Sequence, residues 1–418
     1  MPDARRSRLL AVLVLVVALA AFPLGTLASH DFADVPDSNV FHADISALAA
    51  SGVTTGCGGG NYCPSAFVTR EQMAAFMNRL GALAPGKVPV VNADRLDGLD
   101  SSAFLQSTIE RYKFSEAVAR TPDSTDSVGE YTSIAIGADG NPVISYSDGT
   151  NLDLKLFACA VPSCASGVVR TPDSTDNVGE YTSIAIGADG NPVISYSDVT
   201  NGDLKLFACA NPTCSSGTAR TPDSTGSVGE YTSIVIGDDN NPVISYYDGT
   251  NADLKLFACA NPTCSSGTAR TPDSTGTVGR YSSIAIGDDG SPVISYQDGT
   301  NGDLKAYACA NPTCSSGTAR TLDSTGLLGS HTSIAIGIDG NPVISYRDGT
   351  IDDLKVYACA DPTCAAGTTR TLDSTGNVGV YTSIAIGIDG NPVISYYDFT
   401  NLDLKVLVLP SDSVGVPG

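Results

Sequence analysis

Tyr181-Thr-Ser-Ile-Ala-Ile-Gly-Ala-Asp-Gly-Asn-Pro-Val-Ile-Ser-Tyr196 is the stretch that decides the fold, because close copies of it recur every fifty residues. The six copies begin at Tyr131, Tyr181, Tyr231, Tyr281, His331 and Tyr381. A repeat of this kind is one supersecondary unit that cannot bury its apolar faces alone. It must stack on its neighbours, as in a solenoid or a propeller.

Each repeat predicts four short β-strands. In the second repeat they cover residues 182–186, 192–198, 203–210 and 217–223. These runs are rich in Ile, Val, Thr, Tyr and Phe, and turns of Gly, Asn, Asp and Pro separate them. No part of the repeat has a helical apolar period, which excludes an α-solenoid. Four strands per unit predict a mainly β fold, a six-bladed β-propeller over residues 111–418.

The two ends of the repeat region favour a closed ring. The last repeat supplies only three strands and stops at Leu409-Pro410, whereas residues 117–123 match the fourth strand at 218–223. An N-terminal strand that completes the last blade would leave few exposed sheet edges. A solenoid would need polar capping repeats, which the sequence lacks.

Ten of the twelve cysteines form Cys-x4-Cys pairs across the turn before the fourth strand. The pairs are Cys159/Cys164, Cys209/Cys214, Cys259/Cys264, Cys309/Cys314 and Cys359/Cys364. A tight hairpin brings such residues within disulfide reach; zinc binding is the alternative, although no histidine is nearby. In the sixth blade the equivalent positions are Phe114 and Leu409, which predicts an apolar contact there.

The N-terminal residues 1–28 have the pattern of a secretory signal peptide. Arg5, Arg6 and Arg8 precede an apolar run over residues 9–24, and Thr26-Leu-Ala28 offers a cleavage site. An uncleaved membrane anchor is the alternative. Export to the cell surface would place the cysteines in an oxidising compartment.

Residues 29–83 predict a small helical unit. Apolar residues fall on one helical face near Ile45 and on another near Phe76, and Thr69 opens the second helix with a capping box. A Gly-rich loop between them is expected to be closed by a Cys57–Cys63 disulfide.

Together, Phe32-Ala-Asp-Val-Pro, Gly52-Val-Thr-Thr-Gly and Thr69-Arg-Glu-Gln resemble an S-layer homology domain of the cysteine-containing kind. The resemblance implies attachment to bacterial cell-wall polysaccharide, with Arg70 at the position of the motif's polymer-binding arginine. Glu71 and Gln72 depart from that motif, so only Arg70 is carried over. The family usually presents three such domains and this chain has one; a small folding unit without a ligand is the alternative.

Residues 84–110 are predicted to be a linker. Within them, Leu96-Asp-Gly-Leu-Asp-Ser-Ser-Ala-Phe-Leu105 resembles a short segment that recurs in bacterial surface proteins and tail-fibre-like chains. We expect it to act as a spacer.

Residues that could carry catalysis recur in every repeat. One arginine position recurs six times at fifty-residue spacing, from Arg120 to Arg370, and one lysine position does so from Lys155 to Lys405. Such repetition is better explained by blade packing than by one asymmetric active site. Sialidase-like propellers carry Ser-x-Asp-x-Gly-x-Thr-Trp boxes, and this chain has no Trp. The sequence therefore predicts that the chain is not an enzyme.

The repeats differ from one another mainly at two loops that open on one face. The residues expected to form a binding surface there are Glu130, Glu180, Glu230, Arg280, Tyr247, Gln297, Arg347, Tyr397 and Phe399. Variation on one face of a rigid scaffold is typical of recognition, here of a glycan or a protein. Neutral sequence drift at a solvent-exposed surface is the alternative explanation of the variation. The alternative functions are a purely structural display protein and a glycan-cleaving hydrolase.

The chain is strongly acidic, with a formal net charge of −22 and a pI near 4.2. This charge excludes nucleic acid as a partner, since phosphates require Lys and Arg. Asp148 and Asp153, with their equivalents, could form carboxylate rings that hold Ca²⁺. No calcium-loop motif is present, so solvated carboxylates and no cofactor are expected.

Overall fold

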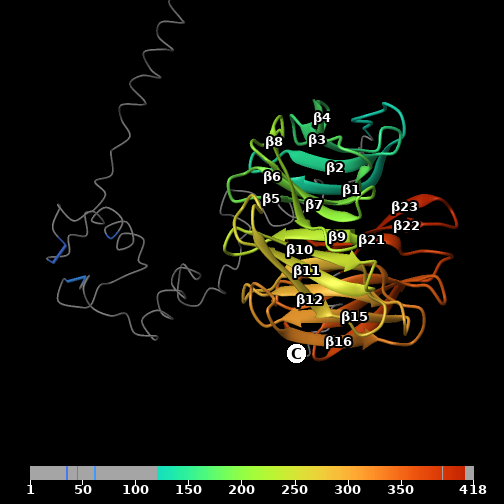
Figure 1. Cartoon of the computed structure of the whole chain (residues 1–418). Helices are drawn as coiled ribbons and strands as arrows, with labels where there is room; N and C mark the ends of the chain where they lie inside the picture. Colours follow the sequence, from blue (N-terminus) through green and yellow to red (C-terminus); the bar gives the residue numbers. More distant parts are fainter. Residues whose placement is uncertain (1–33, 36–44, 46–60, 63–119, 388, 410–418) are drawn as a thin grey trace, which may run out of the picture. The chain divides into compact units, whose positions relative to one another are not determined.

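The computed structural model describes residues 34–35, 45, 61–62, 120–387 and 389–409 (Figure 1). The chain divides into two compact units, residues 1–118 and 119–418, which are considered separately. Within these described ranges, no helix has the length and apolar composition needed to cross a membrane. The predictions for the signal peptide, the Cys57–Cys63 disulfide, Arg70, the linker and the strand containing Phe114 lie outside the described residues.

The described residues of the first unit make a small packed contact. The backbone N–H of Tyr62 donates a hydrogen bond to the Asp34 carboxylate at 2.7 Å. Val35 and Ile45 are buried, and the Tyr62 ring packs against them. Asp34 and Val35 therefore both contact Tyr62, which directly precedes Cys63 in the sequence.

The second unit confirms the six-bladed β-propeller, with each blade an antiparallel sheet in sequence order. Blade 1 contains β1 (Val128–Ile136), β2 (Pro142–Asp148), β3 (Asp153–Cys159) and β4 (Gly167–Asp173). Blade 2 contains β5 (Val178–Ile186), β6 (Pro192–Asp198), β7 (Asp203–Cys209) and β8 (Gly217–Asp223). Blade 3 contains β9 (Val228–Ile236), β10 (Pro242–Asp248), β11 (Asp253–Cys259) and β12 (Gly267–Asp273).

The later blades follow the same order. Blade 4 contains β13 (Val278–Ile286), β14 (Pro292–Asp298), β15 (Asp303–Cys309) and β16 (Gly317–Asp323). Blade 5 contains β17 (Ser330–Ile336), β18 (Pro342–Asp348), β19 (Asp353–Cys359) and β20 (Gly367–Asp373). Blade 6 has three described strands, which are β21 (Val380–Ile386), β22 (Pro392–Asp398) and β23 (Asp403–Val408).

The first strand of most blades begins four residues earlier than its sequence predicts. In blade 2 it starts at Val178 and crosses a β-bulge between Glu180 and Ser183. Gly179 lies in this early part with φ of +94°, and a Cβ there would come within 2.8 Å of the Leu154 Cα in blade 1. Glycine is therefore needed for backbone conformation and for close approach, although the sequence pattern indicates a turn.

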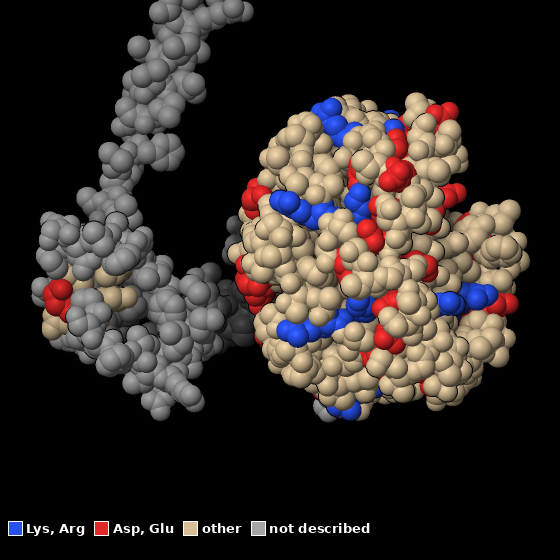
Figure 2. Space-filling view, viewed as in Figure 1, with Lys and Arg blue, Asp and Glu red and all other residues tan. Residues whose placement is uncertain are grey.

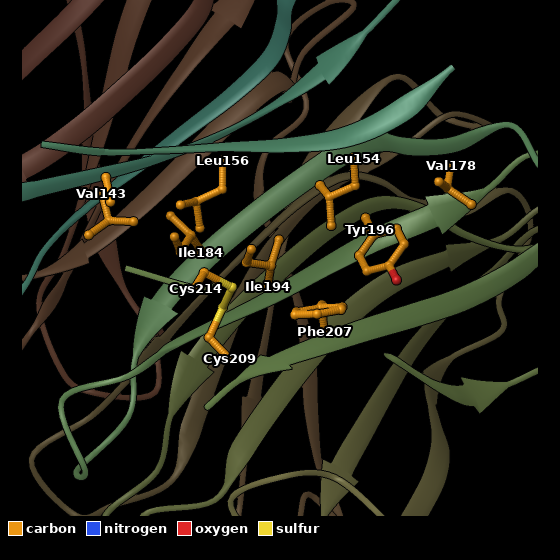
Figure 3. Close-up of a cluster of buried hydrophobic side chains, with 11 residues drawn as sticks. Val143, Leu154, Leu156, Val178, Ile184, Ile194, Tyr196, Phe207, Cys209 and Cys214 are labelled. Atoms are coloured by element: carbon orange, nitrogen blue, oxygen red, sulfur yellow. A yellow bond between two sulfur atoms is a disulfide. The ribbon is translucent and has the colours of Figure 1, made fainter. Parts of the chain in front are cut away.

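The main apolar clusters lie between neighbouring blades. Leu154 and Leu156 of blade 1 pack against Val178, Ile184 and Phe207 of blade 2 (Figure 3). Equivalent clusters join blades 2 and 3, 3 and 4, 4 and 5, and 5 and 6. Each buried leucine contributes roughly 1.5–3 kcal/mol, so stacking of neighbouring blades is the main stabilising interaction.

A polar network accompanies each of these clusters. Asp173, at the end of β4, accepts a hydrogen bond from the Tyr196 hydroxyl of blade 2 at 2.6 Å and pairs with Lys205 at 2.7 Å. The same Tyr–Asp–Lys arrangement recurs at Asp223, Asp273, Asp323 and Asp373. This supports the interpretation of the recurring lysines as packing residues.

The five repeat cysteine pairs form disulfides, with Cα atoms 4.8–4.9 Å apart. The bonds join Cys159 to Cys164, Cys209 to Cys214, Cys259 to Cys264, Cys309 to Cys314 and Cys359 to Cys364. Every cysteine that the structure describes is therefore engaged in a disulfide, and the zinc alternative for these pairs is wrong.

The second cysteine of each pair departs from the ordinary hairpin turn that the sequence pattern indicates. Its backbone has φ of 48–52°, in the left-handed region that glycine or asparagine usually occupies. The residues are Cys164, Cys214, Cys264, Cys314 and Cys364. In each one the backbone N–H donates a hydrogen bond to the carbonyl three residues earlier, at 2.9–3.0 Å. This tight turn holds the second sulfur beside the end of the third strand.

The burial of these cysteines differs between the first blade and the others. The second cysteine is 2–3 % exposed in blades 2 to 5, where it packs in the cluster with the preceding blade. Cys164 of blade 1 is only partly buried, in a smaller cluster with Tyr146 and Phe157 of its own blade.

Leu409 takes the place of the first cysteine in blade 6. It is buried in the cluster with blade 5. An apolar side chain thus stands where the other blades have the first cysteine of the disulfide, while the predicted contact with Phe114 lies outside the described residues.

Candidate functional site

The variable residues of neighbouring strands lie side by side at one end of each blade. Glu230 pairs with Tyr247, and Arg280 pairs with Gln297. The pairs Glu130–Ser147, Glu180–Ser197, Ser330–Arg347 and Val380–Tyr397 are equivalent. The two loops that vary between repeats therefore meet at the same edge, which we call the variable face.

The candidate residues on the variable face differ in their exposure. Phe399 is 57 % exposed, and its ring meets that of Tyr397 at 6.0 Å. Glu130 and Arg280 are also exposed. The expectation that Tyr247 adds aromatic surface is wrong, because its side chain is only 4 % exposed.

The reason for the burial of Tyr247 is local packing. Its ring lies 6.3 Å from that of Tyr231, and the Arg280 guanidinium lies 5.3 Å above its centroid. Two further polar residues are engaged with the protein itself. Gln297 donates a hydrogen bond to the Leu328 carbonyl at 3.1 Å, and Arg347 pairs with Asp352.

A series of aromatic rings adjoins the variable face, and the sequence pattern did not reveal it. The bulged residue of every first strand is aromatic and has φ of 52–54°, a conformation that costs a non-glycine residue about 1 kcal/mol or more. The residues are Tyr131, Tyr181, Tyr231, Tyr281, His331 and Tyr381. Successive rings lie 4.6–4.7 Å apart. The only sequence signal was an aromatic residue at a fixed position, which also fits an ordinary strand.

The aromatic series curves around a common axis. These residues belong to the first strands of the six blades, which are the innermost strands of a propeller. The rings therefore lie around the centre of the propeller, next to the variable face. Burial raises the pKa of Tyr131, and the charge of Glu180 raises it further.

Three glutamates surround the first half of this series. Burial raises the pKa of Glu180, and the charges of Glu130 and Glu230 raise it further, while a hydrogen bond from Tyr131 opposes the rise. Burial also raises the pKa of Tyr231 to about 12. Blades 1 to 3 thus present carboxylates beside neutral tyrosine rings.

Arginines, in place of glutamates, lie beside the second half of the series. Burial, followed by the positive charge of Arg347, lowers the pKa of His331 to about 4. Arg280 lies at the boundary between the two halves, above Tyr247. The centre of the variable face is therefore acidic on one side and basic on the other.

The aspartates suggested as calcium ligands are used within the fold. Asp148 is buried and accepts hydrogen bonds from the backbone N–H of Asn151 at 2.9 Å and from its side chain at 2.9 Å. Lys155 lies 3.7 Å from the same carboxylate. In the part of the chain that the structure describes, no cluster of three His, Cys, Asp or Glu residues is arranged to hold a metal ion.

Comparison with known families identifies the first unit. Residues 31–74 match the model of the S-layer homology domain. The chain thus combines an S-layer homology domain with a six-bladed propeller. Domains of this family bind cell-wall polysaccharide, which indicates a cell-surface protein associated with the cell wall. No curated protein matches the sequence.

Several solved structures resemble the propeller. An α-L-arabinofuranosidase from Fusarium graminearum is 11 % identical, with a TM-score of 0.45, over 68 % of this chain and 93 % of that one. An exo-β-1,3-galactanase from Phanerochaete chrysosporium is 10 % identical, with a TM-score of 0.37, over 64 % and 74 %. An intramolecular trans-sialidase from Ruminococcus gnavus is 12 % identical, with a TM-score of 0.38, over 68 % and 73 %.

These likenesses concern the fold, but they correct one prediction. All three structures are enzymes, so the expectation that this chain is not an enzyme is wrong as an exclusion. Six equivalent copies of a residue do not exclude an active site here, because the variable face is asymmetric around the ring.

Proposed function

We propose that this is an exported surface protein, attached to cell-wall polysaccharide through residues 31–74, whose propeller binds a glycan at the variable face. One observation carries the proposal. Near-identical repeats differ where their strands meet beside a ring of aromatic side chains, so a symmetric scaffold presents an asymmetric surface. Sugars are bound by aromatic faces combined with a few polar groups, and Phe399 with Glu130 and Arg280 supplies both.

The test is a glycan-array measurement with the full exported chain. Phe399→Ala should weaken binding about tenfold, since roughly 1.4 kcal/mol of stacking corresponds to that factor. Ile338→Ala is the matched control, because Ile338 is also exposed but lies in the turn between β17 and β18, away from the variable face. Array binding that is equal for both variants, or absent from all glycans, would contradict the proposal; a captured protein partner would point to protein recognition.

Wall attachment is tested separately with purified cell-wall polysaccharide. Arg70→Ala should reduce sedimentation of the chain with that polymer and leave the array profile unchanged. If Phe399→Ala reduced wall sedimentation as strongly, the assignment of attachment to residues 31–74 would be wrong.

Glycoside hydrolysis is the second candidate function, and the glutamate trio favours it. A carboxylic acid that keeps its proton beside an ionised carboxylate is the acid–base pairing of this reaction. The raised pKa of Glu180, between Glu130 and Glu230, fits the role of the acid. Fluorogenic glycosides should then be cleaved by the wild type, and Glu180→Gln should lose at least a hundredfold in kcat. Exposed Asp239→Asn is the control; turnover that survives Glu180→Gln would refute this assignment.

A further inference from the structure

One arginine on the outermost strand of each of the first four blades has no carboxylate partner, unlike the recurring lysines. Lys205, for example, lies 2.7 Å from Asp173 and 3.8 Å from Asp198. The arginines stand at the equivalent position of β4, β8, β12 and β16, and none of them forms an ion pair with a carboxylate of the described residues. We call them the outer arginine row, which consists of Arg170, Arg220, Arg270 and Arg320.

The first member of the row reaches from one blade to the next. Arg170 donates a hydrogen bond from Nε to the carbonyl of Thr213, in the disulfide turn of blade 2, at 3.4 Å. In the other three members Nε is buried and has no hydrogen-bond partner within the described part of the chain. A buried N–H group without a partner is rare in folded proteins and commonly marks a strained or functional position. Blade packing therefore does not account for the polar end of these side chains.

The outer segments that carry the row contain hydroxyl and amide groups but no carboxylates. Four such segments hold no Asp or Glu, although the chain has 45 of these residues; they are residues 154–172, 204–222, 254–272 and 304–322. Exposed hydroxyl side chains beside the arginine of blade 2 include Ser216, Thr218 and Thr221. In Figure 2 the Lys and Arg side chains form separate groups on the propeller surface, with uncharged residues over wide areas between them. The negative charge of the chain therefore lies elsewhere than on these outer segments.

We infer that the outer arginine row binds an anionic polysaccharide through the carboxylate or phosphate groups of that polymer. The planar guanidinium fork is suited to bidentate hydrogen bonds with either group, and hydroxyl and amide side chains are suited to the sugar hydroxyls between them. One cation per blade fits a polymer whose anions are spaced apart, because packed sheets lie about 10 Å from one another. Nucleic acid, with its closely spaced phosphates, is disfavoured by the acidity of the whole chain.

Such a contact adds to the attachment of the chain to the cell wall. The propeller is joined in one chain to residues 31–74, which match a domain family that binds cell-wall polysaccharide. Contacts that are weak individually become strong together, since the second forms at a high effective concentration once the first holds the polymer nearby. The row contains no residue of the variable face, so this inference is independent of the glycan site proposed there.

Binding of the full chain to immobilised polygalacturonate, a carboxylate polymer, tests the inference. Arg220→Gln together with Arg270→Gln should weaken binding about a hundredfold, because the loss of one charge-assisted pair costs about tenfold in affinity. Arg220→Lys with Arg270→Lys keeps the charges without the fork and should weaken binding less. The lysine variant also controls for folding, because it retains a long apolar stem at both positions. Binding of the wild type should weaken as salt is added.

Arg280→Gln provides a matched comparison with Arg270→Gln alone. Both changes remove one positive charge, but Arg280 belongs to the variable face and Arg270 to the outer arginine row. Arg270→Gln should weaken binding about tenfold, and Arg280→Gln much less. Binding of poly(glycerol phosphate) in place of polygalacturonate would also support the inference and would identify phosphate as the anion. An equal or larger effect of Arg280→Gln, no binding of either polymer, or tighter binding of duplex DNA would overturn it.

Discussion

Asp223→Asn should lower the free energy of unfolding by about 3 kcal/mol, because it removes the anion that neutralises a nearly buried lysine between two blades. Asp223 is buried and holds Lys255, the Tyr246 hydroxyl at 2.6 Å and the Thr225 N–H at 3.0 Å. Asparagine can still accept from Tyr246, and Asp248 remains 3.9 Å from Lys255. The loss therefore lies at the lower end of the range for a broken buried pair, yet it is large beside a total stability of about 5–15 kcal/mol.

Urea denaturation at pH 7 measures this loss. Asp239→Asn is the matched control, since Asp239 caps an exposed turn at Asn241 and should cost less than about 1 kcal/mol. Equal losses for the two variants would show that the Tyr–Asp–Lys network does not stabilise the stacking of blades.

The loss of unfolding free energy caused by Asp223→Asn should depend on pH. Burial raises the pKa of Asp223, but hydrogen bonds from Lys255, Thr225 and Tyr246 outweigh this effect and lower the pKa to about 2. A lowered carboxyl pKa stabilises the fold above the ordinary value of 3.8, and this stabilisation is lost as the pH falls toward 2. The difference between wild type and Asp223→Asn should shrink over that interval.

The sequence was sufficient to predict the architecture because the same pattern of strands and turns occurs six times. Strand length, turn residues and cysteine spacing all follow from local rules, and stacking is the only way to bury the apolar faces of such a unit. The structural roles of Lys205 and its equivalents followed from the same symmetry. The burial and orientation of individual polar and aromatic side chains could not be predicted, because they depend on which residue of another strand or blade each side chain contacts.

Three positions illustrate that limit. Asp148 stands in a polar turn and was expected on the surface, but its carboxylate is buried under hydrogen bonds from Asn151. Tyr247 lies beside a variable loop, yet Arg280 and Tyr231 cover its ring. The sequence pattern predicts Tyr181 as an ordinary strand residue, whereas a β-bulge orients its side chain toward Tyr231 in the aromatic series. Each outcome depends on neighbours from another strand or blade, which local sequence patterns do not specify.

His331 is the one member of the aromatic series whose ordinary pKa lies near neutral pH, and it should make the fold sensitive to acid. Its pKa is lowered from 6.5 to about 4, first by burial and then by Arg347. The unfolded chain therefore takes up a proton between these two values while the folded chain does not. Stability from this group is fully present above pH 6.5 and is lost as the pH falls toward 4, by up to about 3 kcal/mol.

His331→Tyr restores the residue found in the other five repeats and should remove this part of the pH dependence. The free energy of unfolding of wild type and variant, from urea denaturation at pH 7, 6, 5 and 4, should diverge as the pH falls, with the variant becoming the more stable. Tyr281→Phe is a suitable control, because it alters a neighbouring ring, 4.6 Å from His331, without adding or removing a group that titrates in this interval. Parallel pH profiles for wild type and His331→Tyr would mean that His331 is protonated as easily in the fold as in the unfolded chain. In that case the basic half of the aromatic ring would be open to water, and the charge asymmetry of the variable face would be weaker than its burial implies.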